Sequence, residues 1–106
     1  MDDVCATSFA SDADLPRMLE ALRARMPGFE WRMGESHFEG DYVRGVDAAG
    51  VKLRILAEGG RYCVEAYFPL HDDARSAMTD EAKRAILARI EVELLPAVGA
   101  RDPKPA

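Results

Sequence analysis

The stretch VKLRILAEGGRYCVEAYF, residues 51–68, decides the fold of this chain. Two runs of alternating residues flank Gly59-Gly60, and a two-glycine loop favours the primed turn of a tight β-hairpin. The implied register pairs Glu58 with Arg61, Leu56 with Cys63, Arg54 with Glu65 and Lys52 with Tyr67 on one face, and Ala57 with Tyr62, Ile55 with Val64, Leu53 with Ala66 and Val51 with Phe68 on the other. A slip of one residue would bury Arg54 and Glu65, so this register is well specified.

Outward from this hairpin, the pattern predicts two more strands and two helices. Apolar residues alternate with polar ones over residues 29–33, and a second strand is expected over residues 42–46. A helix with Asp14 or Asp12 as its cap and Pro16 in its first turn precedes them. Another helix runs from about Thr79, a good cap, to residue 95.

Short connections favour an antiparallel meander, and each helix has one apolar stripe. We therefore expect an α+β fold of order α-β-β-β-β-α, a two-layer sandwich in which a four-stranded antiparallel meander carries two helices on one face. Residues 13–99 are expected to form a single domain. Residues 1–12 are interpreted as an acidic N-terminal arm and residues 100–106 as a flexible C-terminal tail.

Composition narrows the classes of function. The chain has 106 residues, a net charge of −5 and only three lysines. Binding to a nucleic-acid backbone depends on Lys and Arg displacing counterions, so we expect neither nucleic acid nor an anionic membrane surface as a partner. No apolar run approaches the roughly 20 residues of a membrane span. No nucleophile-elbow or phosphate-loop motif is present, and we expect no cofactor and no enzymatic activity.

The two cysteines, Cys5 and Cys63, belong to no C-x-x-C pair, which argues against a structural zinc site. The N-terminus has neither a positive region nor an apolar core of a signal peptide. We therefore expect a cytoplasmic protein with both thiols reduced.

The segment GESHFEGD, residues 34–41, raises the question of a site. Glu35, His37, Glu39 and Asp41 fall at alternate positions and would share one face of an extended strand, which suits a metal. The chain must reverse here to connect two antiparallel strands, however, and glycines bracket the segment. The favoured interpretation is an acidic hairpin tip that forms a contact surface.

A metal-binding or enzymatic domain is the alternative. His71 would have to lie beside His37, with Glu35 as a carboxylate ligand. In a meander, the two histidines lie at the same end of the sheet, so the topology permits this arrangement.

Arg44 does not fit the expected pattern. Pairing across the turn at residues 47–50 sets Arg44 opposite Leu53, on the apolar face. A bulge or a different turn would flip the second strand; otherwise Arg44 extends its head to the edge, or it is a buried functional charge with a carboxylate partner.

The lead hypothesis is a non-enzymatic protein-binding module of the inhibitor, immunity or chaperone kind, an analogy of fold class with bacterial binding proteins. It would bind a protein partner, most simply a basic one, through its acidic hairpin loops or its open sheet face. The expected binding residues are Glu35, Glu39, Asp41, Arg54 and Tyr67. A homodimer through the sheet face or an edge strand is a further hypothesis.

Overall fold

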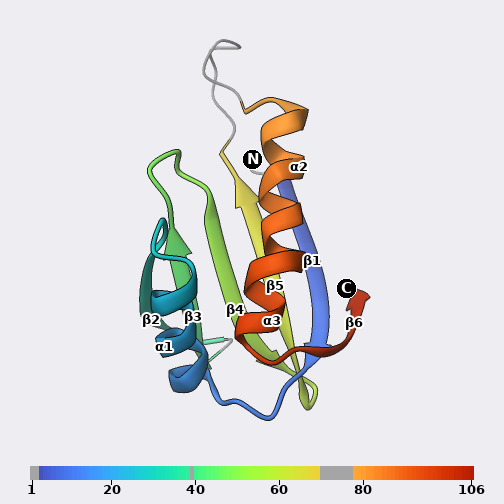
Figure 1. Cartoon of the computed structure of the whole chain (residues 1–106). Helices are drawn as coiled ribbons and strands as arrows, with labels where there is room; N and C mark the ends of the chain where they lie inside the picture. Colours follow the sequence, from blue (N-terminus) through green and yellow to red (C-terminus); the bar gives the residue numbers. More distant parts are fainter. Residues whose placement is uncertain (1–2, 39, 70–77) are drawn as a thin grey trace.

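The computed structural model describes residues 3–38, 40–69 and 78–106. The chain forms a two-layer α+β structure in which one antiparallel sheet carries the helices on one side (Figure 1). The elements are β1 (Asp3–Ala10), α1 (Leu15–Arg25), β2 (Glu30–Ser36), β3 (Gly40–Val46), β4 (Lys52–Glu58), β5 (Arg61–Phe68), α2 (Asp80–Arg89), the π-helix η1 (Ile90–Leu94), α3 (Leu95–Ala97) and β6 (Arg101–Pro105).

The predicted α+β class is correct, but the sheet has six strands rather than four. Their order is β2-β3-β4-β5-β1-β6, and every neighbouring pair is antiparallel. The predicted meander therefore survives as β2 to β5, the first four strands of that order. The β4–β5 register is confirmed at every pair from Glu58–Arg61 to Lys52–Tyr67. Gly59 and Gly60 have φ values of +57° and +80°, as the predicted primed turn requires.

The segments expected to be an arm and a tail contain the two additional strands. β1 pairs with β5 on one side and with β6 on the other, so β6 is an edge strand. Pro103 and Pro105 donate no backbone hydrogen bond, which explains why such a sequence is confined to an edge. The Arg61 side chain ties the strands together, because it donates to the Ser8 hydroxyl at 2.9 Å and to the Asp102 carbonyl at 2.6 Å.

Both predicted helix caps are present. The Asp14 carboxylate accepts from the Arg17 amide at 3.0 Å, and the Thr79 hydroxyl accepts from the Ala82 amide at 3.1 Å. The second helix does not continue as one regular α-helix to residue 95. It passes into η1, where the Leu95 amide donates to the Ile90 carbonyl, and the following Pro96 has no amide to offer.

The facing of β3 decides between the alternatives for Arg44. The Asp47 carboxylate accepts from the amides of Ala49 and Val51, and Gly50 has a φ of +88°. These contacts close a three-residue loop over residues 48–50, so Val46 lies opposite Lys52 instead of residue 51. The whole strand is flipped relative to the simple pairing across the turn, which confirms the first alternative. Arg44 is therefore exposed and is not a buried charge.

The core lies between the sheet and the helices. Val43, on the face where Arg44 was expected, is fully buried there. The β2–β3 hairpin is locked to α1 by Trp31, whose indole N–H donates to the Met26 carbonyl at 2.9 Å. The Trp31 ring also lies over Gly45, where an added Cβ would meet ring atoms at 2.5 Å. This packing sets the positions of the side chains on the other side of β2 and β3.

Candidate functional site

The sheet face opposite the helices is called the open face here. Side chains alternate along a strand, so the registers of β2 to β5 determine which residues share it. They are Glu30, Arg32, Gly34, Tyr42, Arg44, Val46, Lys52, Arg54, Leu56, Arg61, Cys63, Glu65 and Tyr67, with Ser36, Gly40 and Glu58 at its border. The expected binding residues Arg54 and Tyr67 both lie on it.

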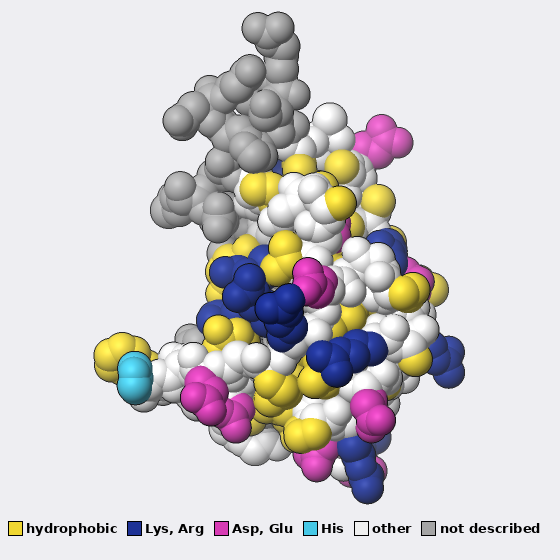
Figure 2. Space-filling model, turned by 90° about the vertical axis from the view of Figure 1, so that its left-hand side faces the viewer, with side chains coloured by type: hydrophobic (Ala, Val, Ile, Leu, Met, Phe, Trp, Pro, Cys, Tyr) yellow, Lys and Arg dark blue, Asp and Glu magenta, His cyan; other side chains and the backbone are white. Residues whose placement is uncertain are grey.

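Three arginines stand side by side on the open face. Arg32 of β2 is the cross-strand partner of Arg44 of β3, which in turn is the partner of Arg54 of β4. We call these residues the arginine row. Neighbouring strands lie about 4.8 Å apart, so the row crosses three strands over roughly 10 Å. Figure 2 shows Lys and Arg side chains gathered on the side of the molecule that carries β2 and β3.

Arg54 is the anchored end of this row. Its guanidinium donates to the Glu65 carboxylate at 2.8 Å and to the Tyr67 hydroxyl at 2.9 Å, and that hydroxyl donates to Glu65 at 2.9 Å. The rings of Tyr42 and Tyr67 lie 5.2 and 5.3 Å from the guanidinium carbon. Only 18% of the Arg54 side chain is exposed. The contacts hold two aromatic rings and a guanidinium in one preorganised group.

Tyr42 and Lys52 complete this group. The Tyr42 ring covers Gly34, where an added Cβ would lie 2.5 Å from a ring atom. The Lys52 ammonium lies 4.9 Å from the centre of the Tyr67 ring. Both tyrosine rings therefore already contact cations, and the glycine at position 34 is what allows Tyr42 to lie flat on the sheet.

The other two arginines are more exposed. Arg32 forms an ion pair with Glu30 of its own strand. For Arg44, no ion pair is found within residues 3–38, 40–69 and 78–106. A cavity of about 250 Å³ lies between the two arginines, and Glu30 and Val46 complete its lining.

Two titratable groups on this face, Cys63 and Tyr67, have raised pKa values. Burial raises the pKa of the Cys63 thiol, and the carboxylates of Glu65 and Glu58 raise it further. Burial also raises the pKa of Tyr67, as does its hydrogen bond to Glu65. A thiol with a raised pKa is a poor nucleophile at neutral pH.

The acidic hairpin tip lies at the end of the same two strands. The chain reverses after Ser36, as expected, and this sets Glu35 directly opposite Asp41 with both side chains exposed. Phe38 at the tip is 99% exposed. His37 is also exposed, whereas Glu39 lies outside the described residues.

The alternative metal site receives no support from this geometry. Across the described part of the chain, no three His, Cys, Asp or Glu side chains come close enough to hold a metal ion. His71, which that site requires, lies outside the described residues.

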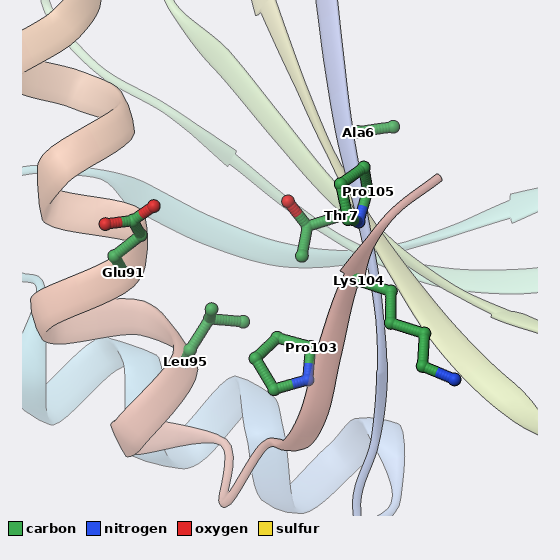
Figure 3. Close-up of a pocket in the computed structure, with 7 residues that line it drawn as sticks. All are labelled: Ala6, Thr7, Glu91, Leu95, Pro103, Lys104 and Pro105. Atoms are coloured by element: carbon green, nitrogen blue, oxygen red, sulfur yellow. The ribbon is translucent and has the colours of Figure 1, made fainter.

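A second cavity, of about 440 Å³, lies between β6, β1 and the π-helical segment (Figure 3). Leu95 and Pro103 face each other across it, with Glu91 on the helix wall and Thr7 at the sheet wall. The sequence patterns did not predict this cavity, because one wall belongs to the segment interpreted as a free tail. Its lining combines the apolar Ala6, Leu95, Pro103 and Pro105 with the polar Thr7, Glu91 and Lys104.

Comparisons with known proteins leave the function to be argued from this geometry. No protein-family model matches the chain, and no curated protein matches it. None of the helices in the described residues is long and apolar enough to cross a membrane.

Sequence reasoning found Arg54 and Tyr67 but missed the row. The row requires Arg44 to lie on the open face. That facing depends on the loop at residues 47–50, whose geometry spacing alone did not settle. Tyr42 was missed for the same reason.

Proposed function

We propose that this protein is a non-enzymatic protein-binding module that engages its partner through the open face. The observation that carries the proposal is the group formed by Arg54, Glu65 and Tyr67, held in place on a sheet face that the helices leave uncovered. Tyr and Arg are the residues most enriched at the energetic centres of protein interfaces.

Preorganisation supports a binding role for this group. An interface loses free energy when mobile side chains must be ordered on association. Here the Arg54 guanidinium is already held between two tyrosine rings. Leu56 and Cys63, only 7% and 4% exposed, form the next cross-strand pair beside it on the same face. The two free cysteines support a reducing compartment, and we place the module in the cytoplasm.

Site-specific photo-crosslinking tests this proposal. A photoreactive amino acid replaces Val46, a half-buried residue of the open face, in the full chain, which is then exposed to an extract of the source cells. A matched control carries the same amino acid at Val92 of η1, which is 73% exposed. We expect a protein partner to crosslink at position 46 and not at position 92. The reverse result would show that the open face is not the binding surface.

The acidic hairpin tip is the second candidate surface, and a basic partner would suit it. Glu35 and Asp41 present two exposed carboxylates, and Phe38 offers a fully exposed aromatic ring. The photoreactive amino acid at Phe38 tests this version in the same extract.

Charge reversal provides a direct check of the hairpin-tip version. Replacing Glu35, Glu39 and Asp41 with Lys should lower the affinity for a partner that contacts the tip and reduce the salt dependence of its binding. Unchanged binding would exclude this version.

In the crosslinking experiments, a crosslinked species of twice the chain's mass would identify the partner as a second copy.

A further inference from the structure

Like charges placed directly opposite each other on neighbouring strands destabilise a sheet. The arginine row contains two such pairs in succession, Arg32–Arg44 and Arg44–Arg54. Arg54 is compensated by Glu65 and Arg32 by Glu30. Arg44, between them, has no ion pair in the described part of the chain and still faces two cations. The middle of the row is thus a positive charge that no ion pair of the described residues neutralises.

This positive charge does not follow from the overall composition. The chain has a net charge of −5, yet the open face of β2 to β5 has more basic than acidic side chains. The basic ones are Arg32, Arg44, Lys52, Arg54 and Arg61, and the acidic ones are Glu30, Glu58 and Glu65. An anionic partner would be repelled by most of the molecule and attracted here, which directs it to one face.

The chemistry of the site suits an oxyanion. The cavity of about 250 Å³ is lined by Arg32 and Arg44, by the Glu30 side chain that pairs with Arg32, and by Val46 as an apolar wall. A planar guanidinium offers paired N–H donors that fit the two oxygens of a carboxylate. Carboxylates two residues apart in an extended peptide share one face and are about 7 Å apart, a spacing that the long side chains of Arg32 and Arg44 can span from neighbouring strands.

We propose that the arginine row binds an acidic, extended segment of the partner protein, with its carboxylates held by Arg44 and Arg32. This inference rests on the proposed function and specifies the chemistry of the partner. Single-stranded nucleic acid fits less well, since it needs free aromatic faces for base stacking. The rings of Tyr42 and Tyr67 are in contact with Arg54, and Tyr42 also covers Gly34.

Fluorescence anisotropy with defined probes tests the inference on the full chain. The first probe is a rhodamine-labelled eight-residue peptide in which Glu alternates with Ser, and the second is its Gln counterpart. The third is an eight-nucleotide oligo-dT. We expect the Glu peptide to bind more tightly than the other two probes, with an affinity that falls as salt is added.

Arg44→Glu should weaken binding of the Glu peptide by about tenfold or more. Arg84→Glu, on the exposed side of α2, makes the same change of charge in the helix layer and should change the affinity less than about twofold. Arg44→Gln, a milder variant, should give an intermediate loss. Circular dichroism confirms that each variant is folded.

Four results would overturn the inference: no binding of the Glu peptide, equal binding of the Glu and Gln peptides, tighter binding of oligo-dT, or undiminished binding by Arg44→Glu. The proposed function can fail separately. If a protein crosslinks at position 46 but Arg44→Glu binds the Glu peptide as the wild type does, only the inference is lost. If no protein crosslinks at position 46, the proposed function is lost as well.

Discussion

The β2–β3 hairpin carries two like-charge pairs of opposite sign. Arg32 faces Arg44 in the middle of the strands, and Glu35 faces Asp41 near the turn. The arginines point to the open face, and the two acids belong to the face that the helices cover further along the strands. One short hairpin therefore presents a basic and an acidic surface to different sides.

The surroundings of the two pairs differ. The acidic pair is exposed near a hairpin end, where solvent screens repulsion, and acidic surface is what a chain of net charge −5 displays in general. The arginine pair extends into a third arginine and into a packed group of tyrosines. Positive charge gathered on one face of a chain with a net negative charge is therefore a stronger sign of a binding surface than exposed acidic residues are.

The largest effect is expected from disrupting the contact between Trp31 and Gly45, which packs the strands that carry both like-charge pairs. In Gly45→Val, the new side chain would overlap the Trp31 ring, because even a Cβ would lie 2.5 Å from ring atoms. We expect a loss of about 3 kcal/mol in the free energy of unfolding, measured in urea. Gly28→Ala is the control, since a Cβ there meets nothing within 4 Å. Equal stability of the two variants would contradict this account of the hairpin.

The next effect separates the anchored arginine from the uncompensated one. Arg54→Ala removes hydrogen bonds to the Glu65 carboxylate and the Tyr67 hydroxyl and should cost about 1.5–3 kcal/mol of stability. Arg44→Ala removes no ion pair found in the described residues and relieves repulsion, so it should be neutral or slightly stabilising. Similar losses in both variants, by urea unfolding, would show that the row has no anchored end.

A smaller effect is expected at alkaline pH. The pKa values of Cys63 and Tyr67 are raised in the folded protein above their usual values of 9.0 and 10.0. From those usual values up to the raised ones, the folded state holds more protons than the unfolded state, so stability falls as pH rises. Urea midpoints between pH 8 and pH 11 should therefore decline.

Tyr67→Phe should flatten this decline above pH 10, although it lowers the stability at neutral pH by removing the hydroxyl contacts. An equal decline of the urea midpoint with pH in the wild type and the variant would mean that the pKa of Tyr67 does not change on unfolding.

The sequence was most informative where local chemistry settles the geometry. Gly59-Gly60 demanded a primed turn, and the alternation on both sides allowed only one register, which the structure confirms. The same reasoning failed at residues 47–50, because Asp47 closes a three-residue loop with hydrogen bonds that spacing does not reveal. That loop decided the facing of Arg44, and with it the arginine row.

The termini were missed for a different reason. β1 consists largely of small and polar residues around the fully buried Phe9, and β6 contains two prolines. Neither has a local pattern that marks a strand. Their pairing depends on β5 and on the Arg61 contacts across 41 and 53 residues of sequence. Tertiary context of this kind lies outside what periodicity can show.

The smallest effect is the most specific test of the comparison. Arg44→Gln relieves two like-charge contacts and Asp41→Asn relieves one, so each substitution should raise the free energy of unfolding by about 0.2–1 kcal/mol or slightly more. The gains should shrink in 1 M salt, where charge repulsion is screened. In the double variant they should add to within about 0.5 kcal/mol, because the two pairs lie on opposite faces.

Affinity for the Glu peptide should distinguish these two variants, although both are expected to gain stability. Arg44→Gln should lose affinity for the Glu peptide as it gains stability, whereas Asp41→Asn should gain stability and keep its affinity. If the repulsion between the arginines is retained because they bind the partner, a substitution that relieves this repulsion should also weaken binding. If both variants bind the peptide equally well, the two pairs are equivalent surface charges, and the arginine row has no role beyond the one the acidic pair has.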